Sequence, residues 1–550
     1  MSGTSRSVVT GPDAAVPSPF LPKLVTVLRE GYSPADLRAD AIAGLTVAIV
    51  ALPLSMAIAI ASGVGPERGL YTAIVGGFLV STFGGSRYQI GGPAGAFIVL
   101  VAACVTQIGL PGLLLATLLS GAMLLALGMA RLGTYIRFIP YPVTLGFTAG
   151  IAVIIFASQL RDLFGLHLPG AEPSELLHKL SALWAARETV SGPALLVSLV
   201  TVALILGLRR LAPRWPAMLI AVAAMSVLAA LGLPVETVGS RFGALPRLLP
   251  APALPPMGAE AVLAALPWAV SFTLLGAIES LLSAVVADGM SGRQHRPNAE
   301  LIAQGIANIG SGLFGGFCVT GTIARTATNV RSGSRGPVSG MLHAVFLALA
   351  LLVAAPLAAY IPLAALAGVL ATVAWNMIER HEIAGMIRAS RVDAAVMVVT
   401  FLLVIFRDLS AGIVVGFALS GLVFVKRMSD AAEVAPHADA VADPGREDRV
   451  IYRLSGPFFF GAAAQLGAVL DRIADHPRVV IVDFSAVPLI DTSGARSLEL
   501  LATKLRKRGG ALWFVGMRPR VAVELRRAGL AEPHIPHFPD LAAAEAALPG

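Results

Sequence analysis

The sequence predicts a polytopic α-helical membrane protein with 14 transmembrane segments arranged as 7+7 inverted repeats, followed by a small cytoplasmic α/β domain. Three observations support this fold class. The chain of 550 residues is 56% hydrophobic and only 13% charged, with a mean hydropathy of +0.78, which is not the composition of a soluble globular domain. Its apolar residues form repeated runs suited to helices in a bilayer. Two of these runs, at equivalent places in the two halves, are interrupted by glycine-rich sequence.

The apolar runs define the candidate segments, since a full span takes about 20 apolar residues. They lie near residues 41–60, 69–83, 91–105, 113–129, 141–160, 193–208, 218–231, 263–287, 301–313, 320–330, 340–355, 362–378, 392–406 and 410–425. The third and the tenth carry the interruptions, so the transporter-like part, residues 37–428, divides into repeats of about 37–232 and 262–428. An odd number of spans in each repeat inverts the second repeat relative to the first.

Basic residues indicate the orientation, because cytoplasmic loops carry an excess of Lys and Arg. Every second connection is rich in arginine, and these residues are Arg87, Arg131, Arg137, Arg209, Arg210, Arg214, Arg293, Arg296, Arg331, Arg335, Arg380, Arg388 and Arg391. We therefore expect both termini on the cytoplasmic side of a bacterial-type inner membrane. Residues 1–36 form a cytoplasmic N-terminal segment without the pattern of a cleavable signal peptide. The net charge of +8 then reflects topology, and no nucleic-acid partner is expected.

Other function classes lack support. Only Cys104 and Cys318 occur, both in apolar surroundings, so neither a disulfide framework nor a metal site is expected. The sequence contains no paired nucleophile and base, no Walker loop and no metal-ligand cluster. We expect no cofactor and no enzymatic activity.

A soluble domain is predicted after a polar linker at residues 429–449. Within residues 450–546 the pattern indicates strands at 450–454, 479–484 and 511–515, and helices at 462–474, 493–507 and 520–527. This alternation of strands and helices predicts a small α/β sandwich.

The two interruptions are the candidate substrate site. One reads Gln89 to Phe97 and the other Gly315 to Thr326. Irregular backbone at membrane depth must be buried in protein or line a cavity. A helix that starts there presents free N–H groups and the positive end of its dipole, which suits an anion. The alternative is that the glycines only allow close helix packing, which explains two equivalent interruptions less well.

Several residues are expected to complete the helix starts. Pro93 and Ala94 suit the first turn of the third segment, and Thr320 or Thr322 suits the cap of the tenth. The two N-termini are expected to approach a shared cavity from opposite faces of the membrane.

Two charged side chains lie within apolar segments, where charge is costly unless it faces a partner or a wet cavity. Arg325 follows the second interruption and is expected to add positive potential to the anion site, although it could instead snorkel to the interface and set the topology. Glu279 is expected to take up a proton as the coupling ion, or, less favoured, to hold sodium with Ser283. The alternative for Glu279 is a structural carboxylate that pairs with Arg325 or with helix N–H groups.

These sequences resemble the SulP (sulfate permease) family of anion transporters. The matching residues are Leu52, Pro53, Met56, Ala57, Pro66, Gly69, Leu70, Tyr71, Phe83, Gly84, Ser86, Arg87, Gly92, Pro93, Thr320, Gly321, Ala324, Arg325 and Thr326. The soluble region resembles a STAS domain, with Asp491-Thr492-Ser493-Gly494 at its signature loop. Together these resemblances cover nearly the whole chain.

The resemblance implies a core domain of segments one to four and eight to eleven that moves against a gate domain, usually in a homodimer. It also implies a site between segments three and ten, formed by Ser55, Gly92, Pro93, Ala94, Gly95, Glu279, Thr322, Ile323, Ala324 and Arg325. Two departures make this pocket less polar than in many relatives: Leu54 and Ile58 replace an amide and an aromatic ring, and Ala324 stands where animal relatives often have serine.

Ser493 has two interpretations. In related STAS proteins the serine of this loop is phosphorylated at a helix start, whereas Asp491 and Ser493 equally suit an ordinary helix cap. The cap is the favoured interpretation, because no kinase partner is evident.

The expected function is ion-coupled secondary transport of a small anion, such as sulfate, bicarbonate or a C4-dicarboxylate. The favoured mode is proton symport by an elevator-like movement. The alternative is a transport-deficient anion sensor that anchors the STAS domain as a signalling scaffold for a cytoplasmic partner. A nucleobase permease of similar segment count is disfavoured because such carriers do not usually bear a STAS domain.

Overall fold

The computed structural model describes residues 18–548 except 137–139, 171, 174, 214, 408, 437–448 and 460–478. Contacts divide the chain into two compact units, residues 1–417 and 418–550. The first unit is helical and the second contains a five-stranded sheet. Each unit is described by itself below.

Every predicted membrane segment corresponds to helical structure. The helices are α2 (Pro34–Ala61), α3 (Pro66–Tyr71), η1 (Thr72–Gly76), α4 (Gly77–Phe83), α5 (Ile98–Met129), α7 (Tyr141–Phe164), α9 (Gly192–Leu211), α10 (Ala217–Ala230), α12 (Ala259–Ser291), α13 (Pro297–Leu313), α14 (Ile323–Arg331), α15 (Val338–Ala358), α16 (Leu363–Met377), α18 (Arg391–Phe406) and α19 (Leu409–Asp430). Eight spans among the described residues are long and apolar enough to cross a membrane by length and composition. The others are shorter or broken, as expected for half-length segments.

Three segments differ in detail from the prediction. The second is not one regular helix, because the π-helical turn η1 separates α3 from α4. The third and fourth join in α5, where Gly109 has a φ of 69° and separates two helical parts just before Pro111. A positive φ is readily adopted by glycine, so this position lets the chain change direction without a longer loop.

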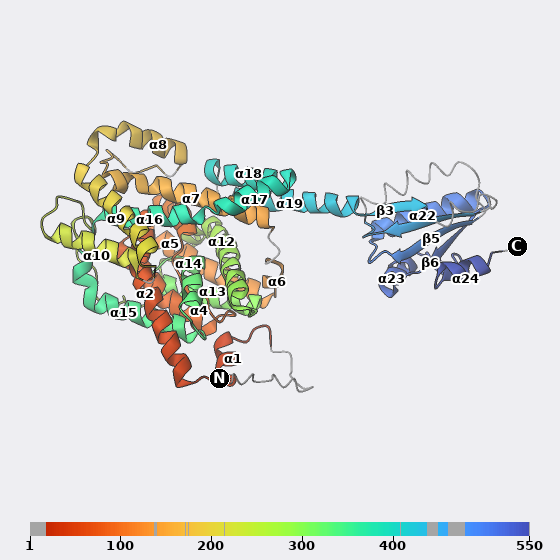
Figure 1. The fold of residues 1–550 in the computed structure, drawn as a ribbon, viewed down its shortest axis with the longest axis horizontal. Coiled ribbons are helices and arrows are strands. Elements are labelled where there is room, and N and C mark those ends of the chain that lie inside the picture. The colour runs from red at the N-terminus through yellow and green to blue at the C-terminus, as the bar shows by residue number, and fades with distance from the viewer. Residues whose placement is uncertain are drawn as a thin grey trace. The chain divides into compact units, whose positions relative to one another are not determined.

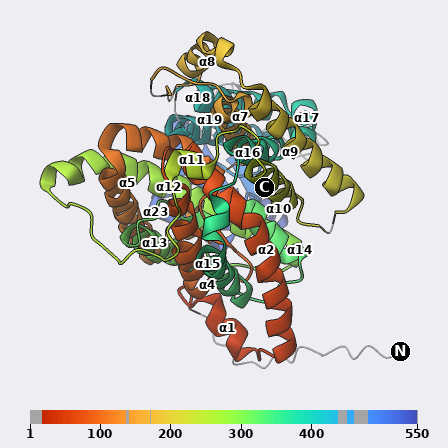
Figure 2. The ribbon, with the colours of Figure 1, turned by 90° about the vertical axis from the view of Figure 1, so that its left-hand side faces the viewer.

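The membrane helices pack in two groups. In the first, α2 packs against α14 and α15, and α5 packs against α12 and α13. In the second, α7 packs against α16 and α18, and α9 packs against α10 and α16. We call these the core group and the gate group. In both ribbon views α14 lies close to α2 (Figures 1 and 2).

Short helices occur outside the predicted membrane segments. They are α1 (Lys23–Arg29), α6 (Gly133–Ile136), α8 (Leu176–Ala185), α11 (Val238–Phe242) and α17 (Arg380–Ala389). Of these, α1 packs against α4 of the core group. Its Val27 side chain is buried, which fixes part of the N-terminal segment to the helical unit.

The second unit is the predicted α/β domain. Its sheet has the order β3-β4-β5-β6-β7, with β3 antiparallel to β4 and the remaining pairs parallel. The strands are β3 (Glu433–Pro436), β4 (Arg449–Ser455), β5 (Val479–Ala486), β6 (Ala511–Val515) and β7 (His537–Phe538), and the helices are α22 (Thr492–Lys507), α23 (Pro519–Arg527) and α24 (Leu541–Ala546). The predicted helix at 462–474 lies outside the described residues.

The structure adds elements to this domain that the pattern did not predict. Strand β3 lies within the segment 429–449 that was predicted as linker, and β7 and α24 follow the last predicted helix. On one face of the sheet, Phe484 and Phe514 pack with ring centroids 5.1 Å apart. Both side chains are fully buried, so the domain has a hydrophobic core of its own.

Candidate functional site

The two glycine-rich interruptions meet in the core group. Strand β1 (Gly91–Gly92) pairs antiparallel with β2 (Thr320–Gly321), in the register Gly91 to Gly321 and Gly92 to Thr320. The Thr322 N–H adds a hydrogen bond of 3.0 Å to the Ile90 carbonyl. After each strand a helix begins, a 3-10 turn at Gly95 leading into α5 and α14 at Ile323. The two helix N-termini therefore start from one short sheet inside the protein.

The helix starts differ from the predicted caps. Pro93 and Ala94 precede the first turn instead of forming it, because the turn begins at Gly95 and Ala94 is extended. Thr322 occupies the cap position of α14, but its hydroxyl donates to the Ile90 carbonyl at 3.1 Å and caps no helix N–H. The hydroxyl of Thr320 pairs with Ser280 at 2.8 Å. The first-turn prediction for Pro93 and Ala94 was therefore wrong, and the capping prediction holds only for the position of Thr322, because among the described residues no side chain caps the first N–H groups of α14.

Polar side chains of the core helices satisfy the irregular backbone before β2. Asn308 of α13 donates to the Val319 carbonyl and accepts from the Val319 N–H, both at 2.9 Å. Thr72 accepts from the Phe317 N–H at 2.9 Å, and Ser311 donates to the Phe317 carbonyl at 2.7 Å. Such pairing is required because the interior of a membrane protein offers no bulk water to these groups.

The irregular backbone before β1 is held in a similar manner. The Glu300 carboxylate accepts from the Gly85 N–H at 2.9 Å and the Ser86 N–H at 3.1 Å. Asn329 donates to the Tyr88 carbonyl at 2.9 Å, and its helix α14 belongs to the other repeat. Each repeat thus supplies side chains that hold the interruption of the other.

We expect Asn308→Leu to destabilise the protein strongly. Leucine has a similar size but leaves the N–H and the carbonyl of Val319 without partners, and each unpaired buried group costs about 1–3 kcal/mol. The measurement is the thermal unfolding midpoint of the purified protein. Thr106→Val is the matched control, because the exposed Thr106 hydroxyl bonds only to its own helix, at Ala102. Equal midpoints for the two variants would contradict this account.

Arg325 is buried at the junction of the repeats, with 1% of its surface exposed. Its Nη2 donates to the Ser55 hydroxyl at 3.1 Å and to the Pro93 carbonyl at 3.4 Å. Its Nε and Nη1 have no hydrogen-bond partner within the described part of the chain. The guanidinium therefore joins α14 to α2 and to the start of α5, which argues against an arginine that snorkels to the interface.

Gly92 is needed for this position of Arg325. A Cβ atom at residue 92 would lie 2.2 Å from Arg325 Nη1, a separation that no side chain tolerates without moving the guanidinium. We expect Gly92→Ala to lower the anion uptake predicted from the sequence about 100-fold, because a misplacement near 1 Å can have an effect of that order. The control is Gly207→Ala in α9, where a Cβ meets nothing within 4 Å. Initial uptake rates in proteoliposomes test this, and a normal rate for Gly92→Ala would contradict it.

Glu279 lies on α12 and keeps part of its surface exposed. Within the described residues its carboxylate makes neither an ion pair nor a hydrogen bond, so the expected alternative of pairing with Arg325 or with helix N–H groups is not observed. Ser283, proposed as its helper for sodium, is fully buried and donates to Thr326 at 3.1 Å. Within the part of the chain that the structure describes, Glu279 is therefore a carboxylate without a charge partner inside a membrane helix, which favours a functional role.

The remaining predicted site residues surround the helix starts. Ser55, Gly92, Pro93, Ala94 and Thr322 are buried, whereas Gly95 and Ile323 are partly exposed and Ala324 is exposed. A Cβ at Gly95 would lie 2.9 Å from Ile155 Cδ1 of α7. The start of α5 therefore faces the gate group, so the exposed backbone lies where the two helix groups meet.

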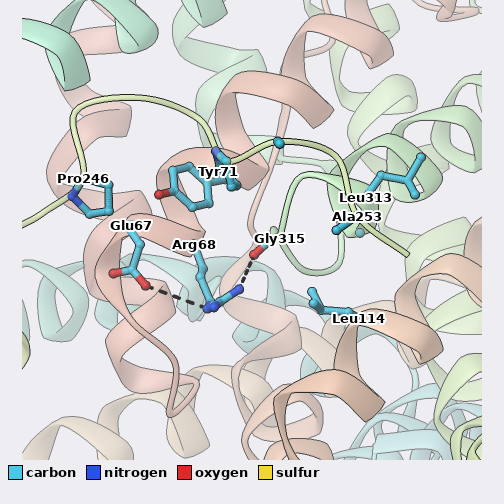
Figure 3. Close-up of a pocket in the computed structure, with 11 residues that line it drawn as sticks. Glu67, Arg68, Tyr71, Leu114, Pro246, Ala253, Leu313 and Gly315 are labelled. Atoms are coloured by element: carbon cyan, nitrogen blue, oxygen red, sulfur yellow. Dashed lines mark hydrogen bonds and ion pairs between the residues drawn. The ribbon is translucent and has the colours of Figure 1, made fainter. Parts of the chain in front are cut away.

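A separate pocket of about 310 Å³ has none of the helix-start residues in its lining (Figure 3). It is lined by Glu67, Arg68, Tyr71, Leu114, Pro246, Pro250, Ala251, Ala253, Gly312, Leu313 and Gly315. Arg68 Nη1 donates to the Gly315 carbonyl at 2.7 Å, where Gly315 has a φ of 71°. Arg68 therefore fixes the turn that leads into the second interruption.

In the α/β domain, Asp491 caps α22 by accepting from the Gly494 N–H at 2.7 Å. Ser493 lies in the first turn of the same helix and is exposed. The cap thus uses Asp491 alone, and the Ser493 hydroxyl is accessible.

Sequence reasoning missed the side chains that hold the interruptions, chiefly Thr72, Glu300, Asn308 and Asn329. One signal was available: Glu300, Gln304, Asn308 and Ser311 recur at helical spacing in α13, and all four are buried. A polar stripe in an apolar segment indicates a face turned toward protein or a cavity instead of lipid.

In this protein two membrane helices start inside the protein, at the short sheet formed by β1 and β2. This is the architecture of a membrane transporter with broken helices. Comparison with known proteins defines the family. The family described as "Sulfate permease family" matches residues 37–400, and "STAS domain" matches residues 440–544. The chain belongs to the sulfate permease family and carries a C-terminal STAS domain.

Individual relatives agree with this assignment. The chain is 39% identical to the Bacillus subtilis protein named "Putative sulfate transporter YvdB", over 91% of this chain and 95% of that one. It is 30% identical to the bicarbonate transporter BicA of Picosynechococcus, over 88% of this chain and 89% of that one.

Solved structures show the same fold. The structure of murine Solute Carrier 26 family member A9 matches with a TM-score of 0.84 at 19% identity, over 96% of this chain and 93% of that one. The transmembrane domain of a cyanobacterial BicA matches with a TM-score of 0.64 at 32% identity, over 70% of this chain and 98% of that one. The first of these likenesses concerns the fold alone.

Proposed function

We propose that this protein is a secondary active transporter of a small anion of the sulfate, bicarbonate or C4-dicarboxylate class. The observation that carries the proposal is the meeting of two helix N-termini beside the buried Arg325, whose Nε and Nη1 have no hydrogen-bond partner among the described residues. Helix N-termini and a guanidinium both favour negative charge. The printed names of two relatives, "Putative sulfate transporter YvdB" and "Bicarbonate transporter BicA", agree with an anion of this kind.

The anion is expected to bind at Ser55, Gly92, Pro93, Ala94, Gly95, Thr322, Ile323, Ala324 and Arg325. The backbone N–H groups at the start of α14 supply donors, because Thr322 does not cap them. Such donors accept any small anion, so the side chains around them limit its size. Ile323 and Ala324 supply little polarity, which favours an anion held chiefly by backbone and by Arg325.

Coupling is assigned to Glu279, with a proton favoured over sodium. A carboxylate near an anion site opposes binding until it is neutralised, so proton binding and anion binding favour one another. Sodium prefers several oxygen ligands, and the proposed second ligand, Ser283, is engaged with Thr326. The resulting transport mode is proton symport.

Movement is proposed to be elevator-like, with the core group moving against the gate group. Support comes from the packing, because the site is built within the core group while the start of α5 faces Ile155 of the gate group. We further propose a homodimer in a bacterial inner membrane with both termini cytoplasmic. Ser493 is a candidate regulatory position for a cytoplasmic partner of the STAS domain.

Uptake in proteoliposomes tests the function. The panel is labelled sulfate, bicarbonate, succinate, fumarate and chloride, each with and without an imposed proton or sodium gradient. Uptake of at least one anion, driven by inward proton movement, is the expected result. Saturable anion binding without flux of any of them would instead favour the alternative of an anion sensor or STAS scaffold.

A further inference from the structure

Three basic side chains from separate parts of the chain come together beside α1. Lys23 begins α1, Arg87 follows α4, and Arg296 precedes α13. Backbone contacts bring these parts together, because the Lys23 N–H donates to the Gly84 carbonyl at 2.8 Å and the Arg296 N–H donates to the Gly85 carbonyl at 2.9 Å. We call Lys23, Arg87 and Arg296 the N-terminal cation cluster.

Side-chain contacts fix two members of the cluster. Arg296 Nη1 donates to the Leu21 carbonyl at 2.8 Å and to the Thr26 hydroxyl at 2.9 Å. Arg87 Nη2 contacts both carboxylate oxygens of Glu30 at 2.5 Å. Both guanidiniums are thus held in place by α1 and the residues flanking it, whereas the Lys23 ammonium forms no ion pair among the described residues.

The carboxylates near the cluster already have partners. Glu30 is engaged by Arg87, and Asp288 is engaged by His295 at 2.6 Å. Burial, and then the guanidiniums of Arg296 and Arg87, lower the pKa of Lys23 to about 8. The lowered pKa is the expected effect of like charges held close together in a partly desolvated place.

The cluster also holds an unused donor. Arg87 is only 9% exposed, and its Nε has no hydrogen-bond partner within the described residues. An unpaired buried donor is costly, and a bound anion would satisfy it. Arg293, which lies near Glu30 and helps to lower the pKa of that carboxyl group, adds a further positive charge.

We propose that the N-terminal cation cluster binds a phosphate group, carried either by the headgroup of an anionic phospholipid or by a soluble phosphate. A phosphate presents several strong acceptor oxygens, which suits donors that arrive from three separate parts of the chain. The cluster lies at the ends of α4 and α12 and the start of α13, where membrane helices meet the headgroups. Basic pockets at this level on the cytoplasmic side bind lipid headgroups, so the proposal rests on the proposed orientation.

The test measures the thermal unfolding midpoint of the purified full-length protein. One arm titrates inorganic phosphate against chloride at matched ionic strength, and the other compares mixed micelles that contain phosphatidylglycerol with micelles of phosphatidylcholine alone. We expect a saturable rise in the midpoint in at least one arm, because a ligand that binds only the folded state stabilises it. A rise with phosphatidylglycerol alone identifies a lipid headgroup, and a rise with inorganic phosphate identifies a soluble ligand as well.

Substitutions test whether the rise in the unfolding midpoint depends on the N-terminal cation cluster. Lys23→Gln should weaken the apparent affinity about 10-fold, the effect of losing one charge-assisted contact, and Lys23→Arg should restore it. Arg38→Gln is the matched control, since Arg38 is an exposed basic residue of the neighbouring helix α2. No rise with either ligand, or an equal affinity for wild type and Lys23→Gln, would overturn the proposal.

Phosphate resembles the proposed substrates, so the substrate site must be separated from the cluster. The response is therefore repeated in Arg325→Ala, which should lose transport and keep the rise. A rise that disappears in Arg325→Ala would assign the phosphate to the substrate site and overturn the cluster as its binding place. A protein that transports normally while showing no rise would refute the cluster alone and leave the proposed function intact.

Discussion

Replacing Arg325 by alanine should reduce anion uptake at least about 30-fold. The substitution removes a buried positive charge and leaves the Ser55 hydroxyl and the Pro93 carbonyl without their donor. Loss of one member of a buried charge interaction costs about 2–5 kcal/mol, which corresponds to roughly 30-fold to several thousand-fold in affinity. The measurement is the initial rate of uptake in proteoliposomes across a range of anion concentrations.

Two further variants define what Arg325 contributes. Arg325→Lys keeps the charge, but a single ammonium does not reproduce the guanidinium fork, so we expect uptake between that of wild type and Arg325→Ala. The control is Arg331→Ala, which removes an exposed arginine at the other end of α14. Wild-type rates and an unchanged KM for Arg325→Ala would show that this residue is only structural.

The effect of Gly92→Ala should depend on Arg325. If the added methyl group acts by displacing the guanidinium, it has nothing to displace once residue 325 is alanine. The double variant should therefore transport no worse than Arg325→Ala alone, which is the non-additivity expected of residues in contact. Additive losses of the uptake rate would indicate that Gly92 acts on anion binding directly and not through Arg325.

The membrane segments and their interruptions were predictable because their signals are local. Apolar runs mark the helices, and the glycines near residues 91–95 and 315–321 mark the places where helical structure stops. Arg325 and Glu279 stood out because charge is rare within such runs. Each of these signals comes from a few consecutive residues and from the known properties of the bilayer. None requires knowing which helices are neighbours.

What could not be predicted depends on contacts between the repeats. Thr322 has the sequence signature of a cap, yet its hydroxyl turns to Ile90, which follows a different helix more than 200 residues earlier. The polar stripe of α13 indicates that Asn308 faces protein, but it does not identify the partner Val319, which is reached only after the chain turns at Gly315. In both cases tertiary packing decided between hydrogen bonds that the sequence alone left equally open.

Glu279→Gln should abolish the dependence of anion accumulation on a proton gradient. Glutamine keeps the shape of a protonated glutamate but binds no proton. Residue 279 would therefore be uncharged beside the anion site at every pH. With one proton per anion, a gradient of one pH unit can support about tenfold accumulation, equivalent to about 1.4 kcal/mol. The variant should equilibrate the anion without that excess, while exchange of labelled for unlabelled anion continues.

The matched control is Glu260→Gln, which changes an exposed carboxylate in the first turn of the same helix. That variant should accumulate anion as the wild type does. Continued accumulation by Glu279→Gln in a proton gradient would place the coupling proton on another group. Accumulation that follows a sodium gradient in the wild type and fails in Glu279→Gln would keep the residue in the coupling role but replace the proton by sodium. Glu279 lacks a charge partner in the described structure, so no fixed cation holds its carboxylate in the charged form. Protonation of Glu279 can therefore depend on anion binding, and this is the physical basis for coupling at this position.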